Sequence, residues 1–295
     1  MQTTDNIFED NTFDINMVLM MVFTSLEEIR VKKNIELIYE IGSTIPKKLK
    51  GDAEALTTFL TEILIFICNN TQNREIVISL SAPQDFLYEE PICFEFKDTG
   101  IDHSKISTFI EENLYNSAIT LDAKIEDNSV NSFQIYMPFK LNELGERRHY
   151  RLPNKDMLHK KVLLICDSQK ESQSIKKMFE YFNYDVIVGF DEHTRNGNQL
   201  KEYDILLMEK EHANRNFEKM ILEIQKEKPL KYVLLHNSHV IDDMHKHIDC
   251  TYLVKPIIQE SIYELITSLF TETVKDANYI FGETSVIVNM NKYID

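Results

Sequence analysis

The chain has 295 residues and a formal net charge of −16, from 48 acidic and 32 basic side chains. This length allows two ordinary domains. A surface with this much negative charge and no long basic tract disfavours binding to nucleic acid. Only 7 glycines occur, with no GxG and no Gly-rich loop, which argues against the close backbone approach that the phosphates of a nucleotide need.

The first ten residues, MQTTDNIFED, are polar and acidic, and they resemble neither a signal peptide nor a transit peptide. No stretch of about 18 apolar residues follows, so we expect no membrane span. The four cysteines stand far apart without CxxC spacing, as is typical of free thiols in a reducing compartment. These features predict a cytoplasmic protein.

Residues 1–140 combine helical and alternating patterns. Ile15 to Ile29 has helical spacing, and apolar residues recur at i, i+3, i+4 and i+7 within residues 51–70, which predicts an amphipathic helix. A short helix is expected from Ser104 to Leu114. We expect an α+β unit in which helices cover one face of a mostly antiparallel sheet. The predicted strands are residues 34–41, 75–81, 92–96, 119–125 and 132–137.

A charged segment, LNELGERRHYRLPNKDMLH, interrupts these patterns at residues 141–159. It contains Gly145 and Pro153, both of which favour turns and irregular structure. We therefore place a linker and the domain boundary in this segment.

Residues 160–271 alternate short apolar runs with helical segments. Five such βα units predict a doubly wound parallel sheet, with the strand order 2-1-3-4-5 as the expectation. A tail, residues 272–295, remains, and its role is open between an extra strand and a docking segment. The predicted strands are residues 162–165, 185–188, 205–208, 232–235 and 252–254, and the helices are residues 169–181, 216–225 and 259–270.

This second half resembles the CheY-like receiver domain of response regulators. The runs VLLICDS, YDILLME and YLVKPI occur in the family's order, and LVKP after the fifth strand is the most specific of them. The resemblance implies a flavodoxin-like fold with an acidic pair that holds Mg²⁺, a phosphoacceptor aspartate, a Ser/Thr and a lysine.

Carried over to this chain, the receiver pattern is only partly kept. The acidic pair becomes Cys166 and Asp167, the phosphoacceptor position holds Glu209, the hydroxyl position falls on His236 or the next residue, and Lys255 is retained. The loss of one carboxylate weakens a Mg²⁺ site, and a glutamate carries its carboxylate one methylene further than an aspartate. We therefore expect a degenerate receiver that is not phosphorylated.

The first half resembles the ATP-binding domain of sensor histidine kinases, a GHKL-type α/β sandwich. NIEL, GD at residues 51–52, the amphipathic helix and FKDTGID follow one another as in that family. The most specific part is DTG, Asp98 to Gly100, because in the family this aspartate contacts adenine.

Several features of the ATP-binding domain are missing. Phe66 stands where the family has a metal-binding asparagine, Glu62 precedes it by four residues, and Asp102 replaces a second glycine. From Ile106 the chain passes almost directly to the final helix and strands, without an ATP lid. The first histidine, His103, comes too late to be the phosphoacceptor. The resemblance therefore implies a degenerate domain without ATP or Mg²⁺ as cofactors.

Three of these residues keep two interpretations each. Asp98 is either a surviving adenine contact or the polar end of a strand before a turn at Gly100, and we favour the turn. Glu209 is either a solvated acid at a strand end or a fixed mimic of a phosphorylated aspartate. Lys255 is either a switch lysine or an ion-pair partner of Glu209 and Asp167, and we favour the ion pair.

The combined interpretation is a degenerate, catalytically inactive relative of bacterial hybrid histidine kinases. It would act as an adaptor or scaffold for other proteins in a signalling or motor-associated assembly, through residues 238–271 and the lidless face of the first domain.

Two alternatives remain. One is an active phosphorelay component that binds ATP or accepts a phosphoryl group. The other is a metal sensor that uses residues 236–250. Its side chains lack the regular spacing of known metal motifs, so we expect no metal site there. The candidate ligands of that sensor are His236, His239, Asp243, His245, His247 and Cys250.

Overall fold

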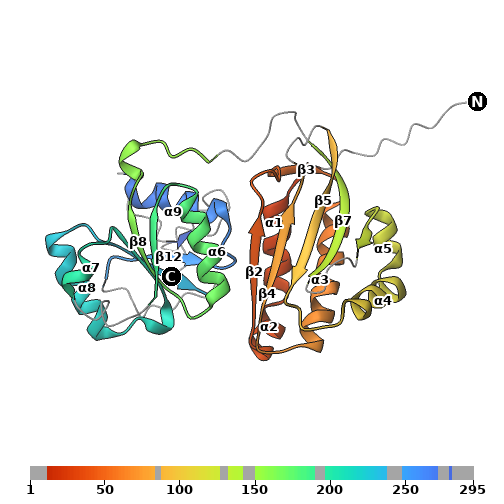
Figure 1. The fold of residues 1–295 in the computed structure, drawn as a ribbon, viewed down its shortest axis with the longest axis horizontal. Helices are drawn as coiled ribbons and strands as arrows, with labels where there is room; N and C mark the ends of the chain where they lie inside the picture. The colour runs from red at the N-terminus through yellow and green to blue at the C-terminus, as the bar shows by residue number, and fades with distance from the viewer. Residues whose placement is uncertain are drawn as a thin grey trace, which may run out of the picture. The chain divides into compact units, whose positions relative to one another are not determined.

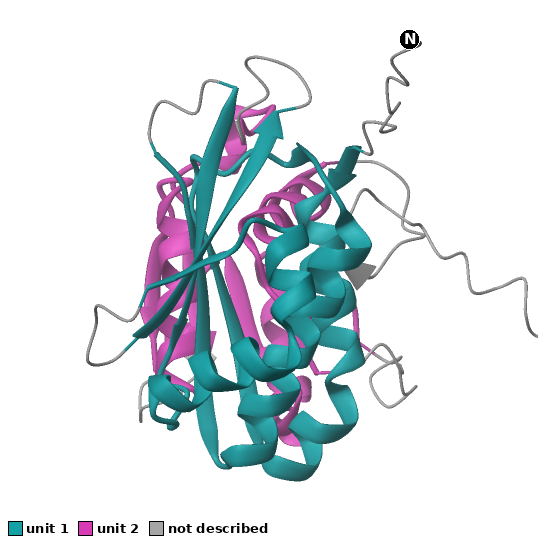
Figure 2. Cartoon of the chain, turned by 90° about the vertical axis from the view of Figure 1, so that its right-hand side faces the viewer, with its two compact units in different colours: residues 1–149 teal, residues 150–295 magenta. Residues whose placement is uncertain are grey.

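A computed structural model describes residues 12–83, 88–126, 132–141, 150–189, 197–237, 248–271 and 279–280 (Figure 1). The chain divides into two compact units, residues 1–149 and 150–295, coloured separately in Figure 2. Among the described residues, no helix is long and apolar enough to cross a membrane. Residues 238–247, and the predicted tail apart from residues 279–280, lie outside the described residues.

Unit 1 contains a mixed sheet with the order β1-β3-β7-β5-β4-β2, and β6 lies beside β7. Strands β2 and β4 are parallel, and the other neighbouring pairs are antiparallel. The sheet is therefore mostly antiparallel, as the sequence predicts. Its strands are β1 (Thr12–Asp14), β2 (Ile35–Ile41), β3 (Lys48–Lys50), β4 (Arg74–Ser81), β5 (Glu89–Lys97), β6 (Lys124–Glu126) and β7 (Ser132–Leu141). Its helices are α1 (Ile15–Ser25), α2 (Glu27–Lys33), α3 (Ala53–Asn70), α4 (His103–Asn113) and α5 (Tyr115–Thr120).

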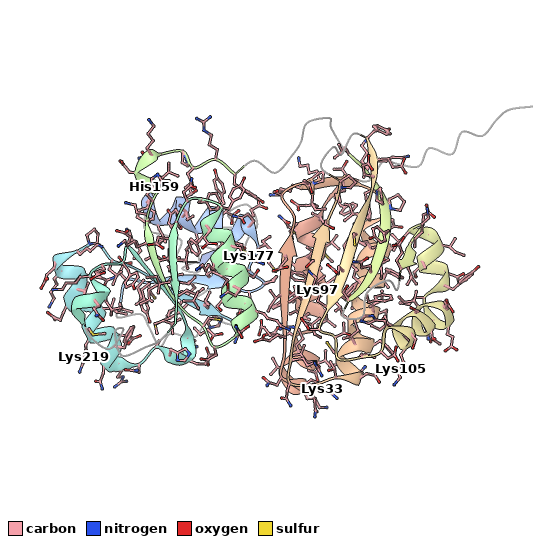
Figure 3. The ribbon with its side chains drawn as sticks, viewed as in Figure 1. Lys33, Lys97, Lys105, His159, Lys177 and Lys219 are labelled. Atoms are coloured by element: carbon pink, nitrogen blue, oxygen red, sulfur yellow. The ribbon has the colours of Figure 1, made fainter. Side chains whose placement is uncertain are left out.

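Helices α1 and α3 lie against one face of this sheet (Figures 1 and 2). Alternate residues of β5, such as Phe94 and Phe96, point to that face and are fully buried. Burying each such side chain contributes about 1.5–3 kcal/mol. On the other face Lys97, labelled in Figure 3, donates to Ser79 Oγ at 3.0 Å and pairs with Glu95 at 3.1 Å. This division between the faces explains the alternating sequence of the strands.

Two predicted elements of unit 1 are wrong in detail. The helix expected at residues 15–29 is two helices, because the chain turns at Leu26, a fully buried residue outside helical geometry. The strand expected at residues 119–125 is mostly helix α5 and a turn at Asp122, whose φ is +46°. Only β6 is extended there.

Unit 2 contains a parallel sheet with the order β13-β12-β11-β10-β8-β9. Its five strands β9-β8-β10-β11-β12 follow the predicted order 2-1-3-4-5, and β13 adds a sixth strand from the predicted tail. The strands are β8 (Lys161–Ile165), β9 (Asp185–Val188), β10 (Ile205–Glu209), β11 (Lys231–His236), β12 (Thr251–Val254) and β13 (Tyr279–Ile280). The helices are η1 (Lys155–Met157), α6 (Gln169–Glu180), α7 (Gly197–Leu200), η2 (Lys210–His212), α8 (Arg215–Glu227) and α9 (Gln259–Phe270).

Helices cover both faces of the second sheet (Figure 1). Leu164 and Leu207 lie in the core beneath α6 and α9, and Leu163 and Leu206 lie in the core beneath α7 and α8. Because both faces are buried, the strands are continuous apolar runs rather than alternating ones. Part of the predicted linker packs here too: Met157 is buried in the first of these cores, and its carbonyl accepts a hydrogen bond from the Tyr184 hydroxyl.

Candidate functional site

The carboxyl ends of parallel strands meet at one edge of a sheet, and polar residues follow three of the central strands of unit 2. Asp167 comes just after β8, Glu209 ends β10, and Lys255 follows β12. Two direct contacts hold the three together: the Asp167 N–H donates to Glu209 Oε2 at 2.7 Å, and Lys255 Nζ lies 3.9 Å from Glu209 Oε1. The structure thus gathers these predicted residues into one cluster.

The closest partner of Lys255 is a residue that the sequence analysis missed. Lys255 is 3% exposed, and its ammonium donates to Glu171 Oε2 at 2.7 Å, with the Glu171 side chain 6% exposed. The expected partners Glu209 and Asp167 are therefore secondary: Glu209 is 3.9 Å away, and the Asp167 carboxylate contacts a histidine instead.

A local signal in the sequence could have found Glu171. Ser168 is the N-cap of α6, and its hydroxyl accepts from the Glu171 N–H at 3.0 Å. Ser168-x-x-Glu171 is the capping-box pattern, which places a glutamate in the first turn of a helix. Since α6 begins at the strand edge, that glutamate starts within reach of the other strand-end residues.

His212 is the second residue missed by the sequence analysis. It ends the short helix η2, directly after β10, and its Nε2 lies 2.9 Å from Asp167 Oδ1 and 3.9 Å from Glu209 Oε2. The Glu209 side chain is 14% exposed, whereas that of Asp167 is 79% exposed. Glu209 is therefore not a solvated acid at a strand end. Its carboxylate faces Lys255 with one oxygen and Asp167 and His212 with the other.

Cys166 stands where the receiver family has its first acid. Burial, and then the nearby carboxylates of Glu171 and Glu209, raise the pKa of its thiol far above the ordinary value. The thiol therefore stays protonated at neutral pH and acts as a weak donor, to Glu171 Oε2 at 3.5 Å and to the Ser168 carbonyl at 3.6 Å. A protonated thiol supplies neither a nucleophile nor a hard metal ligand.

His236 is placed next to Lys255 along the edge and is buried. It is 7% exposed, its ring lies 6.1 Å from that of Tyr252, and its backbone carbonyl accepts from the Lys255 N–H at 3.0 Å. Of the other predicted ligands in residues 236–250, Cys250 is also buried. His239, Asp243, His245 and His247 lie outside the described residues.

In unit 1, DTG forms a tight turn. Asp98 is exposed with φ at +58°, and Gly100 has φ at +73°. The Arg74 side chain lies so close to Gly100 that a Cβ there would meet its atoms at 2.2–2.8 Å. The positive φ favours glycine at this position, and a side chain there would also displace the end of the Arg74 side chain.

The position of the family's metal-binding asparagine is occupied by an aromatic contact. Phe66 of α3 stacks on Phe109 of α4, with ring centroids 4.3 Å apart and ring planes 12° from parallel. Glu62, one turn earlier on α3, is exposed. A phenyl ring offers no oxygen ligand, so the residues present do not fit Mg²⁺–ATP at this position.

No protein-family model matches the sequence, and no curated protein matches it. Similar solved structures include full-length ShkA in complex with AMPPNP, which is 13% identical over 90% of this chain and 58% of its own, with a TM-score of 0.57. The catalytic domain of histidine kinase ThkA is 14% identical over 44% of this chain and 95% of its own, with a TM-score of 0.31. The receiver domain of sensor histidine kinase PA1611 from Pseudomonas aeruginosa PAO1 is 16% identical over 38% of this chain and 97% of its own, with a TM-score of 0.32.

The chain thus spans 58% of the length of ShkA, and at 13% identity the likeness concerns the fold. That likeness extends over 90% of this chain and so includes residues of both units. The chain therefore shares its fold with ShkA, and histidine kinase catalytic domains and receiver domains are among the solved structures that it resembles.

Proposed function

We propose that this chain is a non-catalytic, cytoplasmic adaptor of the two-component type, in which a degenerate ATP-binding unit and a degenerate receiver unit bind other proteins. The observation that carries this proposal is the buried ion pair of Lys255 with Glu171 at 2.7 Å. A receiver lysine reports phosphorylation by binding the phosphoryl group. Here the Glu171 carboxylate already pairs with the lysine, and the Glu209 carboxylate lies 3.9 Å from it.

A buried ammonium that is already paired gains little when a phosphoryl group arrives, because exchanging one negative partner for another requires breaking a desolvated ion pair. The protonated Cys166 thiol adds no negative charge for Mg²⁺. Both features support a receiver unit whose conformation does not depend on phosphorylation.

Unit 1 supports the same conclusion by a different route. The Phe66–Phe109 stack joins α3 to α4 where the family holds a hydrated metal and the triphosphate. An apolar contact there excludes the water that an octahedral Mg²⁺ site needs. We therefore propose that unit 1 binds neither ATP nor Mg²⁺, and that it acts by binding partner proteins on its surface.

Partner proteins in a signalling or motor-associated complex would dock on two surfaces. The first is residues 238–271, of which the structure describes Ile248 onwards, including β12 and α9. The second is the lidless side of unit 1, where α4 and α5 follow the DTG turn. Tyr115 and Ile119 of α5 are 62% and 60% exposed there. They are one helical turn apart, so they present one apolar patch.

Calorimetric titration of the full chain with Mg²⁺–ATP, and labelling with a small radioactive phosphodonor such as acetyl phosphate, test this proposal. We expect no ATP binding at micromolar concentrations and no label. Asp98→Asn and Glu209→Gln are the matched controls, because each removes the one group that the active alternative requires.

Micromolar ATP binding that Asp98→Asn abolishes would show that unit 1 is a working nucleotide site. Label that is lost in Glu209→Gln would make the chain a phosphorelay component. Purification from the native host completes the test. An adaptor should retain the same partner protein in both variants and lose it when the unit that carries its docking surface, unit 1 or unit 2, is removed.

A further inference from the structure

We propose that Asp167, Glu209 and His212 form a binding site for a divalent transition-metal ion, with Zn²⁺ preferred over Mg²⁺. Asp167 lies between β8 and α6, Glu209 ends β10, and His212 ends η2, all at the carboxyl edge of the second sheet. One ligand atom of each lies within 4.8 Å of the other two. This site differs from the sequence-based expectation of no metal, and it does not depend on the adaptor function.

The spacing suits one ion. Metal–ligand bonds of about 2.1 Å place neighbouring ligand atoms about 3.0–3.4 Å apart in tetrahedral or octahedral geometry. His212 Nε2 lies 2.9 Å from Asp167 Oδ1 and 3.9 Å from Glu209 Oε2, so these separations bracket the required value. Small side-chain rotations would bring all three atoms around an ion.

The charge of the cluster also suits a divalent cation. Asp167 and Glu209 contribute two negative charges, and a neutral imidazole contributes none. Lys255 does not cancel these two charges, because its ammonium pairs more closely with Glu171, at 2.7 Å, than with Glu209, at 3.9 Å. The pairing of Glu171 with Lys255 therefore leaves a net negative site beside it.

The ligand types select the metal. Mg²⁺ prefers six oxygen ligands, and the first acid of the receiver pair is here the protonated thiol of Cys166, so the residues present fit Mg²⁺ poorly. An imidazole nitrogen with two carboxylates suits Zn²⁺, Co²⁺ or Mn²⁺. Because the Asp167 side chain is 79% exposed, water can complete the coordination shell.

Calorimetry with ZnCl₂, MnCl₂ and MgCl₂ on the chelator-treated full chain tests this site. Histidines of residues 236–250 could also take up metal, so all measurements use a background in which His239, His245 and His247 are changed to glutamine. We expect about one Zn²⁺ per chain, bound more tightly than Mn²⁺ and at least about 100-fold more tightly than Mg²⁺.

The decisive variant is His212→Gln, and the matched control is Glu211→Gln, which removes an exposed carboxylate from the same short helix. Since outer-shell changes alone cost about 10- to 100-fold in metal affinity, loss of a direct ligand should weaken Zn²⁺ binding at least about tenfold. Pulsed electron paramagnetic resonance of bound Mn²⁺ should show one imidazole nitrogen that disappears in His212→Gln. Circular dichroism checks that each variant is folded.

Three results would overturn the site. The first is Zn²⁺ affinity that is the same in His212→Gln and Asp167→Asn as in the background protein. The second is Mg²⁺ binding as tight as that of Zn²⁺, which would return the cluster to oxygen-only coordination. The third is an effect of Glu211→Gln equal to that of His212→Gln, because general surface charge would then explain the binding.

Discussion

Lys255 is 3% exposed, and an ammonium that is so deeply buried requires a negative partner that is buried with it. The position of the receiver family's first acid holds Cys166, whose raised pKa keeps the thiol neutral. Glu171 supplies the missing charge from the first turn of α6, at 2.7 Å. The carboxylate that the receiver family has at the position of Cys166 is thus replaced by that of Glu171, on the helix that follows.

This arrangement predicts the stability of variants of the pair. Glu171→Gln removes the carboxylate that lies 2.7 Å from the buried Lys255 ammonium, and Lys255→Met removes the ammonium from the buried Glu171 carboxylate, so each should lower the free energy of unfolding by about 3 kcal/mol. The double variant Glu171→Gln/Lys255→Met should cost less than the sum of the two single changes, because it removes both charges of the pair together. Urea denaturation of the full chain measures all three.

Lys177→Met is the control for these variants, since Lys177 is an exposed lysine of the same helix α6 (Figure 3). Its effect should stay within about 0.5 kcal/mol. If Glu171→Gln costs no more than Lys177→Met, the ion pair contributes nothing to stability and its role in the proposed function fails with it.

The residues of this site could be predicted only in part. Asp167, Glu209 and Lys255 follow from one rule, that parallel strands end at a common edge. The same rule does not predict Glu171 and His212, because they stand several residues beyond the ends of β8 and β10. The first turn of α6 and the short helix η2 return them to the edge. His236 is predicted at the same edge, and its buried ring lies 6.1 Å from that of Tyr252.

Among the elements, α4 takes the place in the chain that an ATP lid would have. Asp102 accepts from the Ser104 N–H at 3.0 Å and starts the helix immediately after the DTG turn. Ile106 and Ile110 of α4 are buried, and Phe109 stacks on Phe66 of α3. A packed helix with its own cap is a stable element, whereas a lid must open and close.

The stack between α3 and α4 should therefore be measurable. Phe66→Ala and Phe109→Ala should each lower the free energy of unfolding by about 1–2 kcal/mol, because both rings are half-buried. The double-mutant cycle should give a coupling of about 1 kcal/mol, as is typical of aromatic pairs. Glu62→Ala, one turn away and exposed, is the control and should be nearly neutral. A coupling near zero would show that the rings do not stabilise the packing of α4.

Periodicity predicted most elements and failed where a turn interrupts an apolar series. Ile119, Leu121 and Ile125 alternate like a strand, yet Ile119 is 60% exposed on α5 while Leu121 is buried at the turn. A short helix followed by a turn can present the same alternation as a strand. At residues 15–29 the helical spacing is continuous in sequence, but Leu26 leaves helical geometry to enter the core.

At the scale of the whole molecule, the two units follow different folding rules. Unit 1 buries one face of a mostly antiparallel sheet, and unit 2 buries both faces of a parallel one. The sequence shows this difference directly, as alternating strands before the charged segment at residues 141–159 and continuous apolar strands after it. What it does not show is that residues 150–159 pack with unit 2, because their few apolar residues, such as Met157, carry no periodicity.

Two self-contained cores predict that the units fold independently. Residues 1–149 and 150–295, produced separately, should each unfold in one cooperative thermal transition, because each keeps its own sheet and covering helices. The midpoints of thermal unfolding should lie within a few degrees of those in the full chain.

A second version of unit 2 that begins at residue 160 should be less stable than residues 150–295, since it loses buried Met157 and the hydrogen bond that the Tyr184 hydroxyl donates to the Met157 carbonyl. Scanning calorimetry of the three fragments decides the matter: a fragment 150–295 without a cooperative transition would mean that unit 2 needs unit 1 to fold, and equal midpoints for the two versions would leave residues 150–159 as a linker.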